Sequence, residues 1–332
     1  MGEIRGCVIG AGYFARNHLH AWKDLEGVTI AGVCDLDSRR AEAGADIVGG
    51  RAFGDAAAML DALKPDFVDI VTTHETHRAL VELAVDAGCH VICQKPLALD
   101  RDDATAMVDV CGRAGVHFMV HENFRYQAPM QAARRMIDNG RIGRPNYARI
   151  QHRHHHDIFS AQPYLRTEPQ LAIMDVGVHM LDLARFFMGE VHDLYARTRR
   201  VQRELAGEDS VVISLGHDDE AATLVDISFA TWMQPDPFPQ TLLRIAGDEG
   251  TIEIGEGFHM RVSNSRGGEN FDVSPKSPAW VRSGDGLIEQ SVVVIQQHWL
   301  DCLRRDVDPA TSGADNLKVL DLAWRAYEEA AA

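Results

Sequence analysis

A glycine-rich turn near the start of the chain constrains the fold more than any other feature of the sequence. The apolar run at residues 6–10 has the length of a buried strand, and it leads directly into Gly-Ala-Gly-Tyr-Phe-Ala at residues 10–15. A helical pattern of apolar residues follows. Strand, glycine turn and helix in this order are typical of the first unit of a dinucleotide-binding domain. Gly10 would permit the tight turn, and Gly12 would let a pyrophosphate approach the backbone at the helix N-terminus.

An acidic residue after the second predicted strand bears on which dinucleotide is bound. The strand at residues 28–34 ends in Asp35, at about the distance expected for an acid that accepts hydrogen bonds from the ribose diol of NAD. Such an acid would repel the 2′-phosphate of NADP. NADP is therefore the less favoured cofactor, although Arg39 and Arg40 lie nearby and would attract that phosphate. The structural alternative for Asp35 is a turn or cap residue before Ser38.

A lysine follows a third apolar strand. Residues 91–93 are apolar, and Gln94, Lys95 and Pro96 come next. Pro96 restricts Lys95 to an extended backbone, so the ammonium group is expected to face the crevice at the carboxyl ends of the strands. Open α/β sheets hold their ligands there. The alternative is a solvated surface lysine.

The first part of the chain alternates between strands and helices throughout. A strand at 67–71 precedes a polar loop with Thr72, Thr73 and His77, which suits contacts to ribose or nicotinamide. The alternative for this loop is a cap of the next helix by Thr73 or Thr76. A helix opened by Asp100 and a strand at 117–120 continue the pattern. We therefore predict a doubly wound parallel sheet in an NAD-binding Rossmann domain over residues 1–122.

The second part of the chain has a different pattern and is expected to form a substrate-binding and oligomerisation domain over residues 123–332. It begins with a helix that ends near residue 140, and a mostly antiparallel open sheet follows. Residues 255–286 are rich in Gly and Ser and are expected to be irregular. The predicted strands lie at 146–153, 191–201, 210–215, 221–230, 241–246 and 251–254, and two closing helices, at 291–306 and 314–331, are expected to pack on the first domain.

A helix is predicted over residues 175–189, with Gly189 closing it. Asp175 and His179 are four residues apart and would share one face. A carboxylate beside an imidazole is one way to orient a general base. The alternative is that Asp175 caps the helix and that His179 is a satisfied core histidine.

Four histidines lie close together in the first strand of the second domain. His152, His154 and His156 would face one way, whereas His155 would face the other. Three ligands at every second position of one strand have poor geometry for a metal, so no metal is expected. A polar wall of a substrate pocket and an exposed strand end are the other interpretations.

Net charge and composition exclude several classes of partner. The formal charge of -16 would repel phosphate backbones and anionic membranes, so neither nucleic acid nor a membrane is expected. No run of apolar residues is long enough for a membrane span, and no secretory signal is visible. The six cysteines form no CxxC pair and lie mostly in apolar runs. We therefore expect reduced core cysteines and a cytoplasmic location.

Several motifs together give the chain a family likeness over nearly its whole length. They are the glycine turn, Lys95-Pro96, Asn123-Phe124-Arg125-Tyr126, Asp175-x-Gly177-x-His179 followed by Asp182, and the closing Thr311-Ser312-Gly313-Ala314-Asp315-Asn316. On these residues the chain resembles the glucose-fructose oxidoreductase, inositol dehydrogenase and MocA (Gfo/Idh/MocA) family. Residues 162–166, 187–190 and 206–209 also resemble one sugar dehydrogenase subgroup of that family.

The resemblance implies a Rossmann domain with a nicotinamide cofactor and an α/β domain whose open sheet often forms oligomer contacts. We therefore expect a homodimer or homotetramer built through the C-terminal sheet. The implied reaction is hydride transfer between NAD and a sugar or cyclitol hydroxyl, including the anomeric hydroxyl of an aldose, which would give a lactone. An NAD-dependent glycosidase of the same family and a non-catalytic NAD-binding regulatory protein are the alternatives.

The site residues follow from the resemblance and from the patterns above. Lys95, Asp175 and His179 are the expected catalytic residues. The family usually has Glu before the lysine, whereas this chain has Gln94, which removes a carboxylate near the lysine and the cofactor. The expected cofactor contacts are Gly10, Gly12, Tyr13, Phe14, Asp35, Thr72, Thr73, His77, Gln94 and Lys95, and the expected substrate contacts are Arg125, His154, His156, Tyr164, Arg166, Asp175 and His179.

Overall fold

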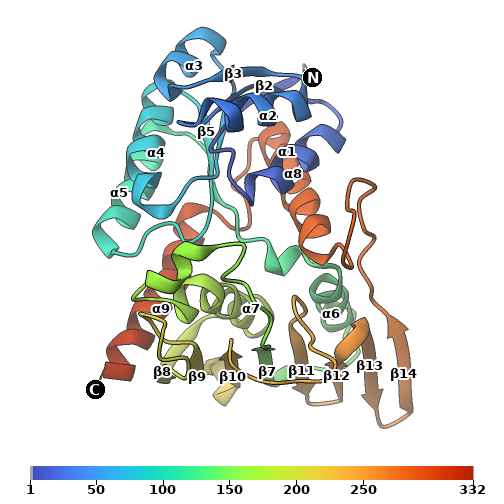
Figure 1. The fold of residues 1–332 in the computed structure, drawn as a ribbon. Helices are drawn as coiled ribbons and strands as arrows, with labels where there is room; N and C mark the ends of the chain where they lie inside the picture. The colour runs from blue at the N-terminus through green and yellow to red at the C-terminus, as the bar shows by residue number, and fades with distance from the viewer. Residues whose placement is uncertain (1–2, 332) are drawn as a thin grey trace. The chain divides into compact units, whose positions relative to one another are not determined.

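The computed structural model describes residues 3–331, which divide into two compact units (Figure 1). The first unit comprises the chain up to Asn123 together with Ser291–Lys318. The second comprises Phe124–Gln290 and the chain from Val319 onward. Each unit is organised around a sheet of its own, and the two sheets differ in strand direction.

The first unit contains a six-stranded parallel sheet in the order β3-β2-β1-β4-β5-β6. The order reverses between β1 and β4, which is the point at which such sheets bind ligands. The predicted doubly wound sheet is therefore confirmed, although the short edge strand β3 was not predicted. The strands are β1 (Ile4–Ile9), β2 (Val28–Cys34), β3 (Arg51–Phe53), β4 (Phe67–Ile70), β5 (His90–Cys93) and β6 (Phe118–Val120).

Side-chain caps fix the starts of several helices in the first unit. Asp37, Asp55 and Asp100 each accept a hydrogen bond from a backbone N–H in the first turn that follows. Asp100 was predicted to open its helix, and it does. The helices are α1 (Ala15–Asp24), α2 (Ser38–Val48), α3 (Ala56–Leu63), α4 (His77–Asp86), α5 (Arg101–Ala114) and, contributing to both units, α8 (Leu287–Arg305) and α9 (Gly313–Ala331). No helix within residues 3–331 is long and apolar enough to cross a bilayer.

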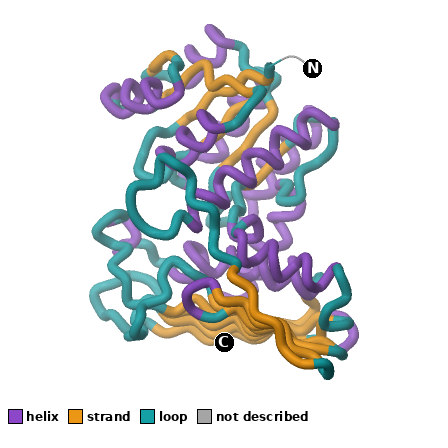
Figure 2. The backbone as a smooth tube through the Cα atoms, turned by 90° about the vertical axis from the view of Figure 1, so that its right-hand side faces the viewer, coloured by secondary structure: helices purple, strands orange, loops and turns teal. Residues whose placement is uncertain are grey.

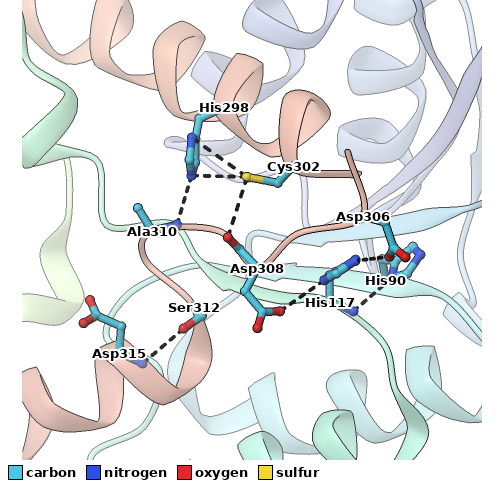
Figure 3. Close-up of polar contacts among 9 residues, drawn as sticks. All are labelled: His90, His117, His298, Cys302, Asp306, Asp308, Ala310, Ser312 and Asp315. Carbon is cyan, nitrogen blue, oxygen red and sulfur yellow. Dashed lines mark hydrogen bonds and ion pairs between the residues drawn. The ribbon is translucent and has the colours of Figure 1, made fainter. Parts of the chain in front are cut away.

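The segment that joins α8 to α9 is tied to β6. The N–H of Val120 donates to the carbonyl of Thr311, and the Thr311 hydroxyl donates back to the carbonyl of Val120, both at 2.9 Å. Figure 3 shows the ring of His117 between the carboxylates of Asp306 and Asp308, at 3.0 and 3.2 Å. The closing motif thus has a structural role in the first unit.

The second unit contains an eight-stranded sheet in the order β14-β13-β12-β11-β7-β10-β9-β8. Its neighbouring strands are antiparallel except for β7 and β10, so the mostly antiparallel sheet is confirmed. Figure 2 shows this sheet with helices over one face. The elements are α6 (Ala128–Asp138), α7 (Val178–Met188), β7 (Pro145–Arg153), β8 (Val191–Arg199), β9 (Ser210–His217), β10 (Ala222–Ser228), β11 (Leu242–Gly247), β12 (Gly250–Ile254), β13 (His259–Asn264) and β14 (Gly267–Asp272).

The expectation of an irregular segment over residues 255–286 is wrong for its first half. Strands β13 and β14 form an antiparallel hairpin at the end of the sheet. In β13 only Met260 and Val262 are buried, and β14 is polar and mostly exposed. Such strands take their stability from pairing with β12 rather than from their own β-propensity, so composition alone did not indicate them.

Candidate active site

The last residues of four strands lie in one row across the parallel sheet. Ile9 pairs with Cys34 on one side and with Ile70 on the other, and Ile70 pairs with Cys93. Because the strands are parallel, the residues that follow this row leave the sheet at one edge. They are Gly10, Asp35, Val71 with Thr72, and Gln94 with Lys95.

The glycine turn at this edge fits a dinucleotide. Gly10 has a φ of +96°, and a Cβ there would lie 2.4 Å from the carbonyl oxygen of Val71, so only glycine is accommodated. A Cβ at Gly12 would meet no atom within 4 Å, which leaves its backbone open to a ligand. Phe14 begins α1 without a side-chain cap, and Tyr13 is exposed. The first N–H groups of α1 therefore suit an anion such as the pyrophosphate of NAD.

The carboxylate of Asp35 faces the glycine turn. One oxygen accepts the N–H of Ala11 at 2.8 Å, and the other accepts the N–H of Asp37 at 2.9 Å. The residue that caps α2 is Asp37, so the cap interpretation of Asp35 is wrong, whereas its bond to the N–H two residues on makes it the turn residue of the other alternative. Each carboxylate oxygen has a further lone pair, and Asp35 is partly exposed. It is thus suited to accept hydrogen bonds from a ribose diol. The nearby Arg39 is exposed.

The loop after β4 is held by its own side chains. The hydroxyl of Thr76 donates to the hydroxyl of Thr72 at 2.8 Å, and neither Thr73 nor Thr76 makes the side-chain cap that was the alternative for them. His77 is fully buried, with its ring nitrogens 3.0 Å from the carbonyl of Leu97 and 3.2 Å from that of Thr72. Burial lowers the pKa of His77. A neutral ring carries one N–H and donates to only one of these two carbonyls, so the contact of His77 with a cofactor stays a prediction.

Lys95 lies two residues after the end of β5 and is half-buried. Its backbone N–H donates to the side-chain oxygen of Gln94 at 2.8 Å, and the amide nitrogen of Gln94 lies 3.1 Å from Nε2 of His18. The other ring nitrogen of His18 contacts Asp69 on β4 at 2.8 Å. Sequence reasoning did not identify His18 or Asp69. An acid inside the apolar strand 67–71 was the available signal, because a buried carboxylate requires hydrogen-bond partners.

In the second unit, His179 lies on α7 and stacks on Phe124, with ring centroids 3.8 Å apart and planes 4° from parallel. Asp175 lies one turn earlier, but that turn is a π-helix, Ile173–Gly177, so the predicted single α-helix from residue 175 is wrong. The N-cap positions of the π turn and of α7 are Ala172 and Gly177, so Asp175 caps neither helix. Single π turns occur frequently at functional sites.

Two of the clustered histidines are buried and neutral. Burial lowers the pKa of His152 to about 3 and that of His154 to about 4. Nδ1 of His154 accepts the N–H of His156 at 3.1 Å, so its proton lies on Nε2, which is buried and has no hydrogen-bond partner among the described residues. Nδ1 of His152 lies 3.2 Å from the hydroxyl of Thr241. His154 thus keeps a donor for a polar ligand, and neutral rings of this kind suit hydroxyl groups.

Three of the other expected substrate contacts are more exposed. His156 stacks on Phe238 with centroids 4.4 Å apart. Arg166 lies over the ring of Phe159 at 4.8 Å, and the hydroxyl of Tyr164 donates to Gln162 at 3.1 Å. Of the expected substrate contacts, His154, Arg125 and His179 are buried, whereas His156, Tyr164 and Arg166 are exposed.

Arg125 is committed to an ion pair. Its guanidinium contacts the carboxylate of Asp182 on α7 through two nitrogens, one of them at 2.8 Å, and both side chains are buried. A bidentate pair of this kind fixes the geometry of both partners. Arg125 therefore positions α7 and the segment before α6, and its contact with the substrate stays a prediction.

A buried glutamate that sequence reasoning did not identify holds the start of the π turn. The carboxylate of Glu208 accepts the N–H groups of Leu171 and Ile173, at 3.3 and 3.0 Å, and the hydroxyl of Tyr327, at 2.7 Å. A Cβ on Gly207 would lie 2.6 Å from the carbonyl of Glu168. Glycine is therefore required next to Glu208, and Glu208 holds the backbone at the point where the π turn begins.

Comparison with known proteins identifies both parts of the chain. Residues 4–122 match the model of the Gfo/Idh/MocA oxidoreductase family with an NAD-binding Rossmann fold. Residues 130–253 match the model of a C-terminal domain of the same family. The glycine turn and the parallel sheet fall in the first match, and the π turn and the antiparallel strands β7 to β12 fall in the second.

Full-length relatives support the same assignment. The chain is 45% identical to the D-apiose dehydrogenase of Rhizobium rhizogenes over all of this chain and 96% of the relative. It is 46% identical to the D-apiose dehydrogenase of Paraburkholderia graminis over 98% of this chain and 87% of the relative. The crystal structure of an oxidoreductase from Agrobacterium radiobacter in complex with NAD+, L-tartaric acid and magnesium is 45% identical, covers 99% of this chain and 96% of its own, and has a TM-score of 0.96. The chain therefore belongs to the Gfo/Idh/MocA family of oxidoreductases, with an NAD-binding Rossmann domain at its N-terminus.

Proposed function

We propose that this protein is an NAD-dependent dehydrogenase that oxidises a sugar hydroxyl reversibly. The observation that carries the proposal is the shared edge of the parallel sheet, at which Lys95 follows the same row of paired residues as Gly10 and Asp35. A lysine on that edge lies on the side from which the glycine turn receives a dinucleotide. Relatives named D-apiose dehydrogenase at 45 and 46% identity support a sugar as the substrate class.

The proposed roles follow from the chemistry of each side chain. The ammonium group of Lys95 donates a hydrogen bond to the oxygen of the reacting hydroxyl. His179 accepts the proton that leaves this oxygen, and Asp175 orients the histidine. In the alternative arrangement, Lys95 accepts the proton and His179 donates the hydrogen bond. NAD+, when bound, supplies the hydride acceptor. The carbon loses a hydride, the oxygen loses a proton, and a carbonyl group forms.

We further propose that the second unit recognises the other hydroxyls of the sugar through neutral donors. Nε2–H of His154 is buried and without a hydrogen-bond partner among residues 3–331, and its low pKa keeps the ring neutral. A neutral imidazole donor suits an uncharged polyol, because it brings no charge that the substrate would have to balance. Tyr164 and Arg166 are exposed and would contact the more distant hydroxyls.

The substrate itself is proposed to be an aldose oxidised at its anomeric carbon, which gives a lactone. Both full-length relatives are named for the same aldose, and this supports testing D-apiose first. A panel of D-apiose, other aldoses, cyclitols and sugar acids, assayed with NAD and with NADP through the absorbance of the reduced nicotinamide, tests the proposal. Trapping the product with hydroxylamine distinguishes a lactone from a ketone. Release of sugar from a glycoside without net NADH would favour the glycosidase alternative instead.

Self-association through the second sheet is also proposed. Tyr147, Tyr195 and Val212 are large side chains exposed on its strands. Exposed apolar and aromatic groups on a broad sheet face are typical of a protein interface. Light scattering of the intact chain and of a Tyr195→Lys variant tests this. A lower mass for the variant is expected, and a monomeric wild-type protein would contradict the proposal.

A further inference from the structure

A buried chain of hydrogen bonds runs from the interior of the first unit to the backbone of Lys95. It begins at Asp69 on β4, whose side chain is fully buried. One oxygen of Asp69 accepts from Nδ1 of His18 at 2.8 Å and from Nε1 of Trp22 at 2.7 Å. His18 is itself fully buried on α1 and has ring contacts with Phe14, whose centroid is 5.6 Å away, and with His121 at 4.0 Å.

The hydrogen bonds fix the direction of this chain. The side-chain oxygen of Gln94 accepts the N–H of Lys95, so the atom that faces His18 is the amide nitrogen. An amide nitrogen only donates, and Nε2 of His18 must therefore accept. The proton of the ring then lies on Nδ1, where it is donated to Asp69. A singly protonated ring satisfies both of its neighbours in this arrangement.

We propose that Asp69, His18 and Gln94 are positioning residues that hold Lys95 for catalysis. Because the ring of His18 carries one proton, on Nδ1, the side chain at position 94 must donate a hydrogen bond to Nε2. This inference rests on the proposed role of Lys95. Gln94 is then the matched partner of His18, and a carboxylate at position 94 would not fit the same ring state. A side chain that merely filled the core would not couple a protonation state to the geometry of Lys95.

Replacement of Gln94 by Glu tests the match. An ionised carboxylate at position 94 can only accept hydrogen bonds, and the same is true of the unprotonated Nε2 of His18. A hydrogen bond between these two side chains therefore forms only when they take up one additional proton. The titratable groups that face the pair are Asp69 from β4, Cys93 from β5 and His121 after β6, while Gln296 from α8 contributes a neutral donor to the carbonyl of His18. All of these are present in the wild type as well, so an ionisation that only the variant shows arises from the carboxylate introduced at position 94.

We expect kcat/KM for sugar oxidation by Gln94→Glu to rise as pH falls, with a limiting slope of about tenfold per pH unit that the wild type lacks. The dissociation constant for NAD should stay within about threefold, because residue 94 acts here through Lys95. Gln296→Glu is the matched control, since it also places a carboxylate in the core beside His18 but does not reach Lys95. It should lose thermal stability without showing the new ionisation. Identical pH profiles for Gln94→Glu and wild type would overturn the inference.

The tautomer of His18 gives a second readout that requires no activity. In ¹⁵N NMR spectra of the wild-type protein, His18 should carry its proton on Nδ1 with an unprotonated Nε2. A proton on Nε2 would overturn the inference even if the enzyme were active and Gln94→Glu failed to fold. The failure of the proposed function looks different, because NAD would bind and the Nδ1 tautomer would be present while no sugar was oxidised.

Discussion

The imidazole of His179 lies flat against the phenyl ring of Phe124, with centroids 3.8 Å apart and planes 4° from parallel. Such a stack restricts rotation of the imidazole, and it is worth about 1 kcal/mol beyond the burial of the two rings. We expect Phe124→Leu to lower kcat about tenfold while KM changes by less than about threefold, because the base would lose its orientation. Steady-state kinetics check this. Phe271→Leu on the mostly exposed strand β14 is the control and should leave kcat unchanged.

Gly12→Ala separates a ligand clash from a folding defect. A Cβ at Gly12 meets no protein atom within 4 Å, so the variant should unfold at the temperature of the wild type. The added methyl would stand where the pyrophosphate approaches, and we expect the dissociation constant for NAD to rise by about tenfold or more. Isothermal titration calorimetry measures it. Gly112→Ala, at another open position in α5, should bind NAD normally. Unchanged affinity in Gly12→Ala would contradict the assignment of the cofactor site.

The low pKa values of His152 and His154 imply a pH-dependent stability. In the unfolded chain these rings take up protons as pH falls below about 6.5, whereas in the folded protein they stay neutral to about pH 3 and 4. The free energy of unfolding is therefore unaffected by these rings above pH 6.5. As pH falls from 6.5 toward the folded pKa values, it decreases by up to about 1.4 kcal/mol per pH unit for each ring. NMR titration of the histidine Cε1–H signals checks this. Titration of both rings near pH 6.5 would contradict it.

Much of the fold follows from local sequence signals. The glycine turn, Asp100 as a helix cap and the strand runs of the parallel sheet each carry a periodicity or a cap that local chemistry determines. The register that brings Gly10, Asp35 and Lys95 to one edge follows from parallel pairing. Local signals in the sequence were therefore sufficient to predict which residues meet at the carboxyl edge of the parallel sheet.

Features that depend on tertiary contacts could not be predicted in the same way. The π turn that carries Asp175 depends on Glu208, which is distant in the sequence. The hairpin of β13 and β14 depends on pairing with its neighbour. The ion pair of Arg125 with Asp182 was not predicted either, because such pairing depends on where α7 lies in the folded protein.

Glu208 should be required both for stability and for the position of Asp175. Glu208→Ala would leave the N–H groups of Leu171 and Ile173 without their acceptor, and we expect a loss of about 3 kcal/mol in stability together with a lower kcat. Tyr327→Phe is the matched control, because it removes one donor to Glu208 and leaves the two backbone contacts. It should lose only about 1 kcal/mol and keep its kcat. Thermal unfolding and steady-state kinetics of both variants check this, and equal losses in the two would contradict it.

Single-turnover reduction of NAD by excess enzyme, with a sugar that the panel identifies, tests the proposed chemistry most directly. Wild type and Lys23→Ala, which removes an exposed lysine of α1, should form the reduced nicotinamide at the same rate. Lys95→Ala and His179→Ala should each be slower by about a hundredfold or more while still binding NAD. Undiminished hydride transfer in both of these variants would contradict the assignment of Lys95 and His179 to the reaction.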